Sequence, residues 1–166
     1  MSTTTLRETL APSDPDAIRR IVRDTGLFRD DEVDVAGELA EERLAKGAAS
    51  GYHFAVAEEN GAVTGYVCVG PIPCTVHSWD LYWVAVAPDQ QGKGLGSELT
   101  RRGEAIARAM GGRRMYVDTS TRPDYLPTRR FYERNGYAIA ASLPDFYDAG
   151  DGKAIYCKIL EPEDQP

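Results

Sequence analysis

The segment Gln91–Ser97 (Q-G-K-G-L-G-S) has the residue types of an anion-binding turn. Its glycines, Gly92, Gly94 and Gly96, let the backbone approach a ligand closely because no Cβ stands in the way. A strand-like run precedes the segment and a helical pattern follows it, so its amides would lie at a helix N-terminus. There the unpaired N–H groups and the helix dipole favour negative charge. These features predict a phosphate or pyrophosphate site. The alternative is a glycine-rich helix start that binds nothing.

Two common phosphate motifs do not fit this segment. A P-loop needs Ser or Thr after its lysine, whereas Gly94 follows Lys93. A dinucleotide fingerprint needs the spacing G-x-G-x-x-G, whereas the spacing here is G-x-G-x-G, and Asp118 is weak compensation as its acidic partner. Both nucleotide-binding classes are therefore disfavoured.

The pattern Gln91-x-x-Gly94-x-Gly96, directly after the strand end V-A-V, resembles the Q/R-x-x-G-x-G/A signature of the GNAT N-acetyltransferase superfamily. In that family the signature binds the pyrophosphate of acetyl-CoA. A second segment, F-Y-E-R-N-G-Y from Phe131 to Tyr137, is similar to the family's F/L-Y-x-x-x-G-F/Y segment. With one strand between the two motifs, the resemblance runs from about Asp80 to Tyr137.

The resemblance implies that acetyl-CoA is the co-substrate and that no metal takes part. The strand before the turn would pair its backbone with pantetheine, as an added strand does. One of its N–H groups would also polarise the thioester carbonyl. The residues expected to bind acetyl-CoA are Trp83, Val84, Ala85, Val86, Gln91, Gly92, Lys93, Gly94, Leu95, Gly96 and Ser97.

Tyr132 matches the tyrosine of the family's F/L-Y segment, and we expect it to be the general acid that protonates the departing thiolate. A phenol with an ordinary pKa near 10 is close enough to an alkyl thiol for proton transfer. The alternative is an aromatic side chain that only fills the core.

Asp80 is the residue we expect to act as general base. Two-residue alternation places Asp80, Tyr82, Val84 and Val86 on one face of their strand. Counted back from Gln91, Asp80 occupies the place where some family members carry a glutamate base. Burial beside the cleft would raise its pKa toward a useful value. The alternative is a strand-end Asp that caps the preceding proline-rich loop.

The acceptor site is defined less sharply by the sequence. The family usually has Asn seven residues and Ala four residues before its tyrosine, and Tyr125 and Thr128 stand there instead. The loop of residues 144–152 would make an acidic, aromatic rim suited to a cationic amine, or it is a solvated loop. Its candidates include Asp148 and Asp151. The residues expected to contact the acceptor are Tyr82, His77 (beside the entrance), Tyr125, Asp145 and Tyr147.

The elements that must position these residues alternate between strands and helices. Asn60-Gly61 between two strand-like runs is a strong hairpin signal. Ser13 followed by Pro15 indicates the start of a helix. The predicted order is β-α-α-β-β-β-α-β-α-β-β, which is an α+β, GNAT-like domain with a mixed, mostly antiparallel twisted sheet flanked by helices. The predicted strands are 3–9, 52–58, 62–69, 80–87, 113–119, 137–141 and 154–159, and the predicted helices are 13–25, 31–46, 95–110 and 126–135.

Composition limits the class of protein. The 166 residues fit one domain, expected over 1–160, with a disordered tail at 161–166. A net charge of −7 argues against nucleic acid as a partner. Between Gln91 and Arg134, ten Lys and Arg face five acids, which suits a compact anionic ligand. No apolar run is long enough for a membrane span, and three cysteines without a C-x-x-C pair favour a reducing cytoplasm. Homodimers are common in the family.

We therefore expect an N-acetyltransferase that moves an acetyl group from acetyl-CoA to a primary amine of a small molecule or protein, by direct attack in a ternary complex. A GNAT-like sensor that binds acyl-CoA without turnover is the alternative. A nucleotide-binding structural domain is a third interpretation, disfavoured by the failed phosphate motifs.

Overall fold

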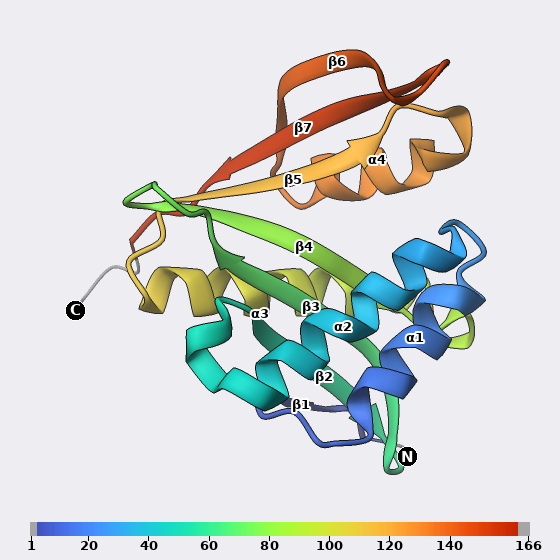
Figure 1. Ribbon diagram of the computed structural model, residues 1–166, viewed down its shortest axis with the longest axis vertical. Coiled ribbons are helices and arrows are strands. Elements are labelled where there is room, and N and C mark those ends of the chain that lie inside the picture. The colour runs from blue at the N-terminus through green and yellow to red at the C-terminus, as the bar shows by residue number, and fades with distance from the viewer. Residues whose placement is uncertain (1–2, 163–166) are drawn as a thin grey trace.

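The chain, described by a computed structural model over residues 3–162, forms a seven-stranded sheet with helices on both faces (Figure 1). The strand order is β1-β2-β3-β4-β5-β7-β6; β4 and β5 are parallel, and every other adjacent pair is antiparallel. The predicted fold class and order of elements are confirmed. Residues 163–166 of the predicted disordered tail lie outside the described range. The strands are β1 (Thr5–Arg7), β2 (His53–Glu59), β3 (Ala62–Pro71), β4 (Ser78–Val86), β5 (Arg114–Ser120), β6 (Ala138–Asp148) and β7 (Asp151–Ile159).

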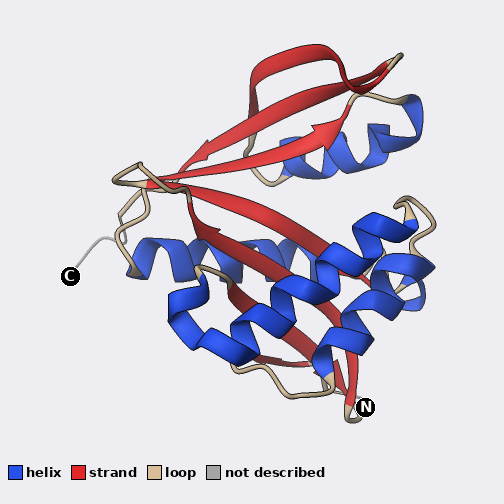
Figure 2. Cartoon of the chain, viewed as in Figure 1, coloured by secondary structure: helices blue, strands red, loops and turns tan. Residues whose placement is uncertain are grey.

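Four α-helices flank the sheet in this range (Figure 2). Helices α1 (Asp14–Asp24) and α2 (Asp30–Lys46) cover one face, and α3 (Leu95–Ala109) and α4 (Leu126–Arg134) lie on the other. Ser13 occupies the N-cap position of α1, but its side chain makes no cap hydrogen bond. The carboxylate of Asp14 accepts a hydrogen bond from the Ala11 N–H at 2.7 Å and so holds the segment that precedes the helix.

The sheet separates two buried apolar clusters. The first packs α1 and α2 on β2 and β3, through side chains such as Ile18, Val33 and Phe54. The second lies under α3 and α4 and joins residues from both halves of the sheet, such as Val67 and Val69 of β3, Met115 and Val117 of β5, and Tyr156 of β7. This second cluster holds β4 and β5 in one body even where the two strands do not pair.

The β4/β5 pairing is short. It covers only Ser78–Asp80 on β4 and Arg114–Tyr116 on β5. Strand β4 continues to Val86 against β3, and its register with β3 shifts so that Tyr82 is an extra residue between Leu81 and Trp83. A bulge of this kind bends a strand and increases its twist. The two halves of the sheet therefore diverge after Asp80 (Figure 1).

The last two strands are longer than predicted. The sequence from Ser142 to Lys153 is rich in Asp, Gly and Pro and was expected to be a loop, but most of it belongs to β6 and β7. Leu143 pairs with Lys153, and Asp148 pairs with Asp151 across a tight turn. The prediction of a long loop is therefore wrong, because cross-strand pairing overrides the turn-like composition. The register shift after Leu143 leaves residues 144–147 as an irregular segment.

A buried ion pair ties α3 to the second half of the sheet. The side chain of Glu104 is almost fully buried, and its carboxylate accepts hydrogen bonds from Lys158 Nζ at 2.9 and 3.0 Å and from the Tyr137 hydroxyl at 3.1 Å. Burying a carboxylate without hydrogen-bond or ionic partners destabilises the folded state. The contact with Lys158 therefore sets how α3 lies against β7.

We expect Lys158→Met to lower the free energy of unfolding by about 2 kcal/mol, because it leaves the buried Glu104 carboxylate with the Tyr137 hydroxyl and, as its nearest remaining cation, Arg108 at 3.9 Å. Urea denaturation measures the change. Lys46→Met, which removes the exposed pair with Glu42, is the control and should leave stability nearly unchanged. Equal effects of the two substitutions would show that the buried pair does not hold α3.

Candidate functional site

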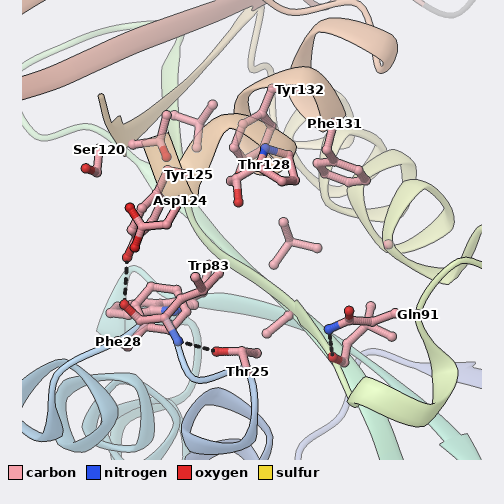
Figure 3. Close-up of a pocket in the computed structure, with 18 of the residues that line it drawn as sticks. Thr25, Phe28, Trp83, Gln91, Ser120, Asp124, Tyr125, Thr128, Phe131 and Tyr132 are labelled. Carbon is pink, nitrogen blue, oxygen red and sulfur yellow. Dashed lines mark hydrogen bonds between the residues drawn. The ribbon is translucent and has the colours of Figure 1, made fainter. Parts of the chain in front are cut away.

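A cavity of about 1000 Å³ opens where β4 and β5 diverge. Its walls come from β4, the turn before α3, the end of β5, α4 and the connection between α1 and α2. Figure 3 shows Thr128, Phe131 and Tyr132 of α4 on one side, with Phe28 and Trp83 across from them. Phe28 and Trp83 pack with ring centroids 5.7 Å apart, so this wall is aromatic. The cavity is therefore lined by both halves of the sheet, beyond the point where β4 and β5 stop pairing.

The glycine turn forms one end of the cavity. Gly92 (φ 75°) and Gly94 (φ 84°) have left-handed backbones, and a Cβ at either would face open space. Any other residue type there would be strained. The Gln91 side chain donates a hydrogen bond to the Val86 carbonyl at 3.1 Å and so holds the turn against the end of β4 (Figure 3). The turn leads into the N-terminus of α3, whose free amides suit an anion.

The third glycine has a packing role that the motif does not reveal. A Cβ at Gly96 would lie 3.3 Å from the Phe131 ring, so Gly96 lets α3 approach α4. Of the predicted residues of the turn, Gln91, Gly92, Gly94, Gly96 and Ser97 line the cavity. Lys93 and Leu95 do not: Lys93 Nζ donates to Gln90, and the Leu95 side chain is buried in the core.

The far half of β4 offers a free backbone edge. Trp83, Val84, Ala85 and Val86 all line the cavity, and each pairs with β3 on its other side. Because β5 has left this edge, the outward backbone groups have no strand partner among the described residues. An extended ligand can hydrogen-bond there as an additional strand would. The free edge and the glycine turn together fit pantetheine followed by a pyrophosphate.

Tyr132 lies on α4 and lines the cavity. Its side chain is largely buried, between the rings of Phe131 and Tyr137 at 5.4 and 5.7 Å. Burial raises the pKa of its hydroxyl above the ordinary value. The hydroxyl therefore keeps its proton at neutral pH and is held by packing in one orientation.

Asp80 is half-buried beside the cavity but is not one of the lining residues. Its pKa is raised to about 6, mainly by burial and also by the nearby Asp118 carboxylate, while Lys153 opposes the shift. Asp118 does line the cavity and is paired with Lys153 Nζ at 2.6 Å. A carboxylate with this pKa can accept a proton at neutral pH.

The predicted alternation along β4 is wrong beyond Tyr82. The bulge at Tyr82 shifts the register, so Ala85 packs in the α1/α2 cluster while Val86 packs in the α3/α4 cluster. Asp80, Tyr82, Val84 and Val86 therefore do not share one face. A single extra residue changes the side to which every later side chain points.

Three of the five residues predicted to contact an acceptor line the cavity: Tyr82, Tyr125 and Tyr147. The Tyr125 hydroxyl donates to the Leu27 carbonyl at 3.0 Å and joins α4 to the α1–α2 connection. Asp145 is not a lining residue, because its carboxylate accepts a hydrogen bond from the Gly150 N–H at 2.7 Å and stabilises the β6–β7 turn.

His77 lies elsewhere, and its placement beside the entrance is wrong. It precedes β4, and its Nδ1 is 3.0 Å from the Gly111 carbonyl. The cavity is at the other end of β4, and His77 lines a separate small depression with Arg113 and Ile159.

Sequence reasoning missed Phe28 and Glu32 as lining residues, and it weighed Asp118 only against a motif that failed. Phe28 comes from the α1–α2 connection and Glu32 from the first turn of α2, far from the motifs. Asp118 carried a usable signal, because it lies near the end of the strand predicted to follow the glycine-turn helix.

Neither a metal centre nor a membrane-spanning helix is found in residues 3–162. No group of three or more His, Cys, Asp or Glu side chains is arranged there to hold a metal ion. In the same range, no helix has the length and apolar composition needed to cross a bilayer.

Comparison with known proteins places these features in a family. The model of the Acetyltransferase (GNAT) family matches residues 16–137. An amino-acid acetyltransferase from Ralstonia nicotianae is 34% identical over 93 residues, which are 56% of this chain and 20% of that protein. The chain thus spans about a fifth of that relative's length.

Solved structures agree over nearly the whole chain. A crystal structure from Desulfovibrio desulfuricans, assigned to the GNAT family of acetyltransferases, has a TM-score of 0.94 and 45% identity over 96% of this chain and 100% of that one. The YncA structure from Salmonella typhimurium, solved with acetyl-CoA, has a TM-score of 0.75 and 25% identity over 99% of this chain and 98% of that one. The resemblance inferred from the two motifs is confirmed.

We expect Asp80→Asn to stabilise the protein at pH 8 but not at pH 4. The folded state raises the Asp80 pKa from 3.8 to about 6, so the folded state favours the protonated form. The resulting stability is present below pH 4 and lost as the pH rises through 6. A pKa difference of about two corresponds to about 3 kcal/mol of folding free energy. Because solvent screens this half-buried group, we expect the substitution to stabilise the protein by about 1 kcal/mol at pH 8. Urea denaturation at both pH values measures it.

Asp34→Asn, on the exposed side of α2, removes the same charge and is the control for net charge. An Asp80→Asn advantage that is equal at pH 4 and pH 8 would contradict the assignment of a raised pKa to Asp80.

Proposed function

This chain belongs to the GNAT acetyltransferase family, and on that basis we propose that it transfers the acetyl group of acetyl-CoA to a primary amine by direct attack in a ternary complex. The observation that carries the proposal is the single cavity that contains the glycine turn, the free edge of β4 and Tyr132. When bound, acetyl-CoA supplies an acetyl group activated as a thioester.

The backbone would bind and orient the co-substrate. The amides of residues 91–96 would hold the pyrophosphate, with Gly92 and Gly94 allowing close approach. The free edge of β4 over residues 83–86 would hold pantetheine and direct one N–H toward the thioester carbonyl. The Ala normally found four residues before the tyrosine is Thr128 here, and its side chain also lines the cavity.

Asp80 and Tyr132 would move the two protons. As the N–C bond forms and the C–S bond breaks, Asp80 takes the proton that the amine loses; the carboxylate of Asp118, which lines the cavity, lies near it. Tyr132 gives its hydroxyl proton to the departing sulfur and regains one from solvent. Burial raises the Tyr132 pKa, and the same apolar surroundings make the thiolate a stronger base, so the transfer remains favourable.

The acceptor would be a primary amine of a small molecule or a protein. The three cysteines are free, with Cys68 buried and Cys74 exposed, which accords with action in a reducing cytoplasm.

The first test is Tyr132→Phe. We expect kcat to fall about 100-fold while the KM for acetyl-CoA changes by less than about twofold, because only the proton donor is lost. Thiol release measured with a panel of amines gives both constants. Tyr156→Phe is the control, since Tyr156 packs near Tyr132 but lies outside the cavity lining. An unchanged kcat at every pH would remove Tyr132 from the mechanism.

The second test is the pH profile of Asp80→Asn. In the wild-type protein kcat/KM should rise through about pH 6, as Asp80 ionises, and the variant should lack this limb and be about 100-fold slower at pH 8. A profile that keeps the limb would assign the base to another group. Acetyl-CoA binding without thiol release for any amine would instead support the sensor.

A further inference from the structure

The end of the cavity away from the glycine turn is built from elements distant in sequence. We call it the acceptor end and define it by Phe28, Glu32, Tyr82, Asp118, Tyr147 and Asp151, all of which line the cavity. They come from the α1–α2 connection, α2, β4, β5, β6 and β7. Three of the six are carboxylates and three are aromatic.

Most cations near the acceptor end are already engaged. Lys153 Nζ pairs with Asp118 at 2.6 Å, and Arg122 Nη2 pairs with Asp124 at 3.1 Å. Arg29, on the rim, is bonded to Asp31 at 3.1 Å.

Glu32 and Asp151 are the carboxylates left in excess. Glu32 accepts the Arg29 backbone N–H at 2.8 Å, and no cationic side chain of residues 3–162 pairs with it. Asp151 is largely buried, accepts a hydrogen bond from Ser120 and has Arg122 Nε only at 4.0 Å. Asp31, then Glu32 and Asp151, raise the pKa of the Arg29 guanidinium, so Arg29 offsets part of this charge. The three cations Arg29, Arg122 and Lys153 nevertheless face five carboxylates, so the acceptor end keeps an excess of negative charge: Asp31, Glu32, Asp118, Asp124 and Asp151.

The aromatic rings face the same region. The pKa of Tyr147 is raised to about 12, mainly by burial and also by the nearby carboxylates of Asp118, Asp151 and Glu32. Phe28 meets Tyr125 edge-on at 6.5 Å and completes an aromatic wall. Carboxylates combined with aromatic faces select cations, because both present negative potential.

We propose that the acceptor carries a second cationic group besides the amine that is acetylated, as in a small aliphatic diamine. The second cation lies between Glu32, Asp151 and the ring of Tyr147, and the reacting amine lies toward Asp80 and Tyr132. An acceptor carboxylate at this end would face Glu32 and Asp151 and would be repelled. The inference rests on the proposed acetyl transfer and assigns its substrate class.

The test compares three acceptors of one chain length: 1-aminobutane, 1,4-diaminobutane and 4-aminobutanoate. With acetyl-CoA and thiol release as the readout, kcat/KM for the diamine should exceed that for the monoamine by about tenfold, mainly through KM, and the aminocarboxylate should be the poorest. Glu32→Gln should reduce the diamine preference to about twofold. The amide oxygen still accepts the Arg29 N–H, so α2 keeps its start.

Glu38→Gln is the matched control, because Glu38 lies on the exposed side of the same helix and loses the same charge. It should leave the preference for the diamine intact. Equal kcat/KM for the three acceptors, a preference for the aminocarboxylate, or equal effects of the two Gln substitutions would overturn the inference.

Failure of the inference and failure of the proposed function can be separated. Thiol release with monoamines but no preference for the diamine overturns only the inference. If acetyl-CoA binds but no amine releases thiol, the proposed function fails. Calorimetric titration of the diamine into CoA-saturated protein then tests the ligand class by itself. Diamine binding that Glu32→Gln weakens about tenfold supports the ligand class, and absence of diamine binding overturns it.

Discussion

The structure depends on one constraint, the loss of β5 as a partner of β4 after Asp80. The extra residue at Tyr82 bends β4 while β3 continues to hold it, so the second half of the sheet diverges. A divergence inside a sheet leaves backbone N–H and C=O groups without strand partners. Such groups lower the stability of the fold unless a ligand or water forms hydrogen bonds with them. In this protein the divergence opens the cavity, and in the proposed reaction the unpaired edge would serve as a binding surface.

A sheet divided in this way needs another contact to keep its halves in place. The cluster under α3 and α4 provides it, because it contains side chains from both halves, such as Val67 and Tyr156. Gly96 lets α3 meet Phe131, and Glu104 connects α3 to Lys158 on β7. The helix that begins at the glycine turn is thus also the support of the divided sheet. The geometry of the turn is therefore fixed by packing before any ligand arrives.

The sequence predicted those parts of the site that depend on local chemistry. Gln91, Gly92 and Gly94 could be found because left-handed turns and helix starts need particular residue types. It did not predict the bulge at Tyr82, because an extra residue in a strand has no signature in the alternation of side chains. His77 was misplaced because nearness in sequence was taken for nearness in space. A nine-residue strand is about 30 Å long, so its two ends lie far apart.

The sequence pointed to Tyr82, Tyr147 and Asp151 of the acceptor end but not to Phe28 or Glu32, because Glu32, Asp118 and Asp151 meet only through tertiary structure. Their arrangement gives the cavity two ends of opposite character. The amides at the start of α3 and the nearby Arg134 make one end positive, and the carboxylates make the other negative. An anionic co-substrate and a cationic acceptor would each be attracted to one end and repelled from the other. In the proposed reaction this polarity orients both substrates, so that the thioester and the amine meet between the two ends, beside Tyr132 and Asp80. The acidic surroundings that would attract the acceptor also raise the pKa of Asp80 through Asp118, so acceptor binding and proton removal would depend on the same charges.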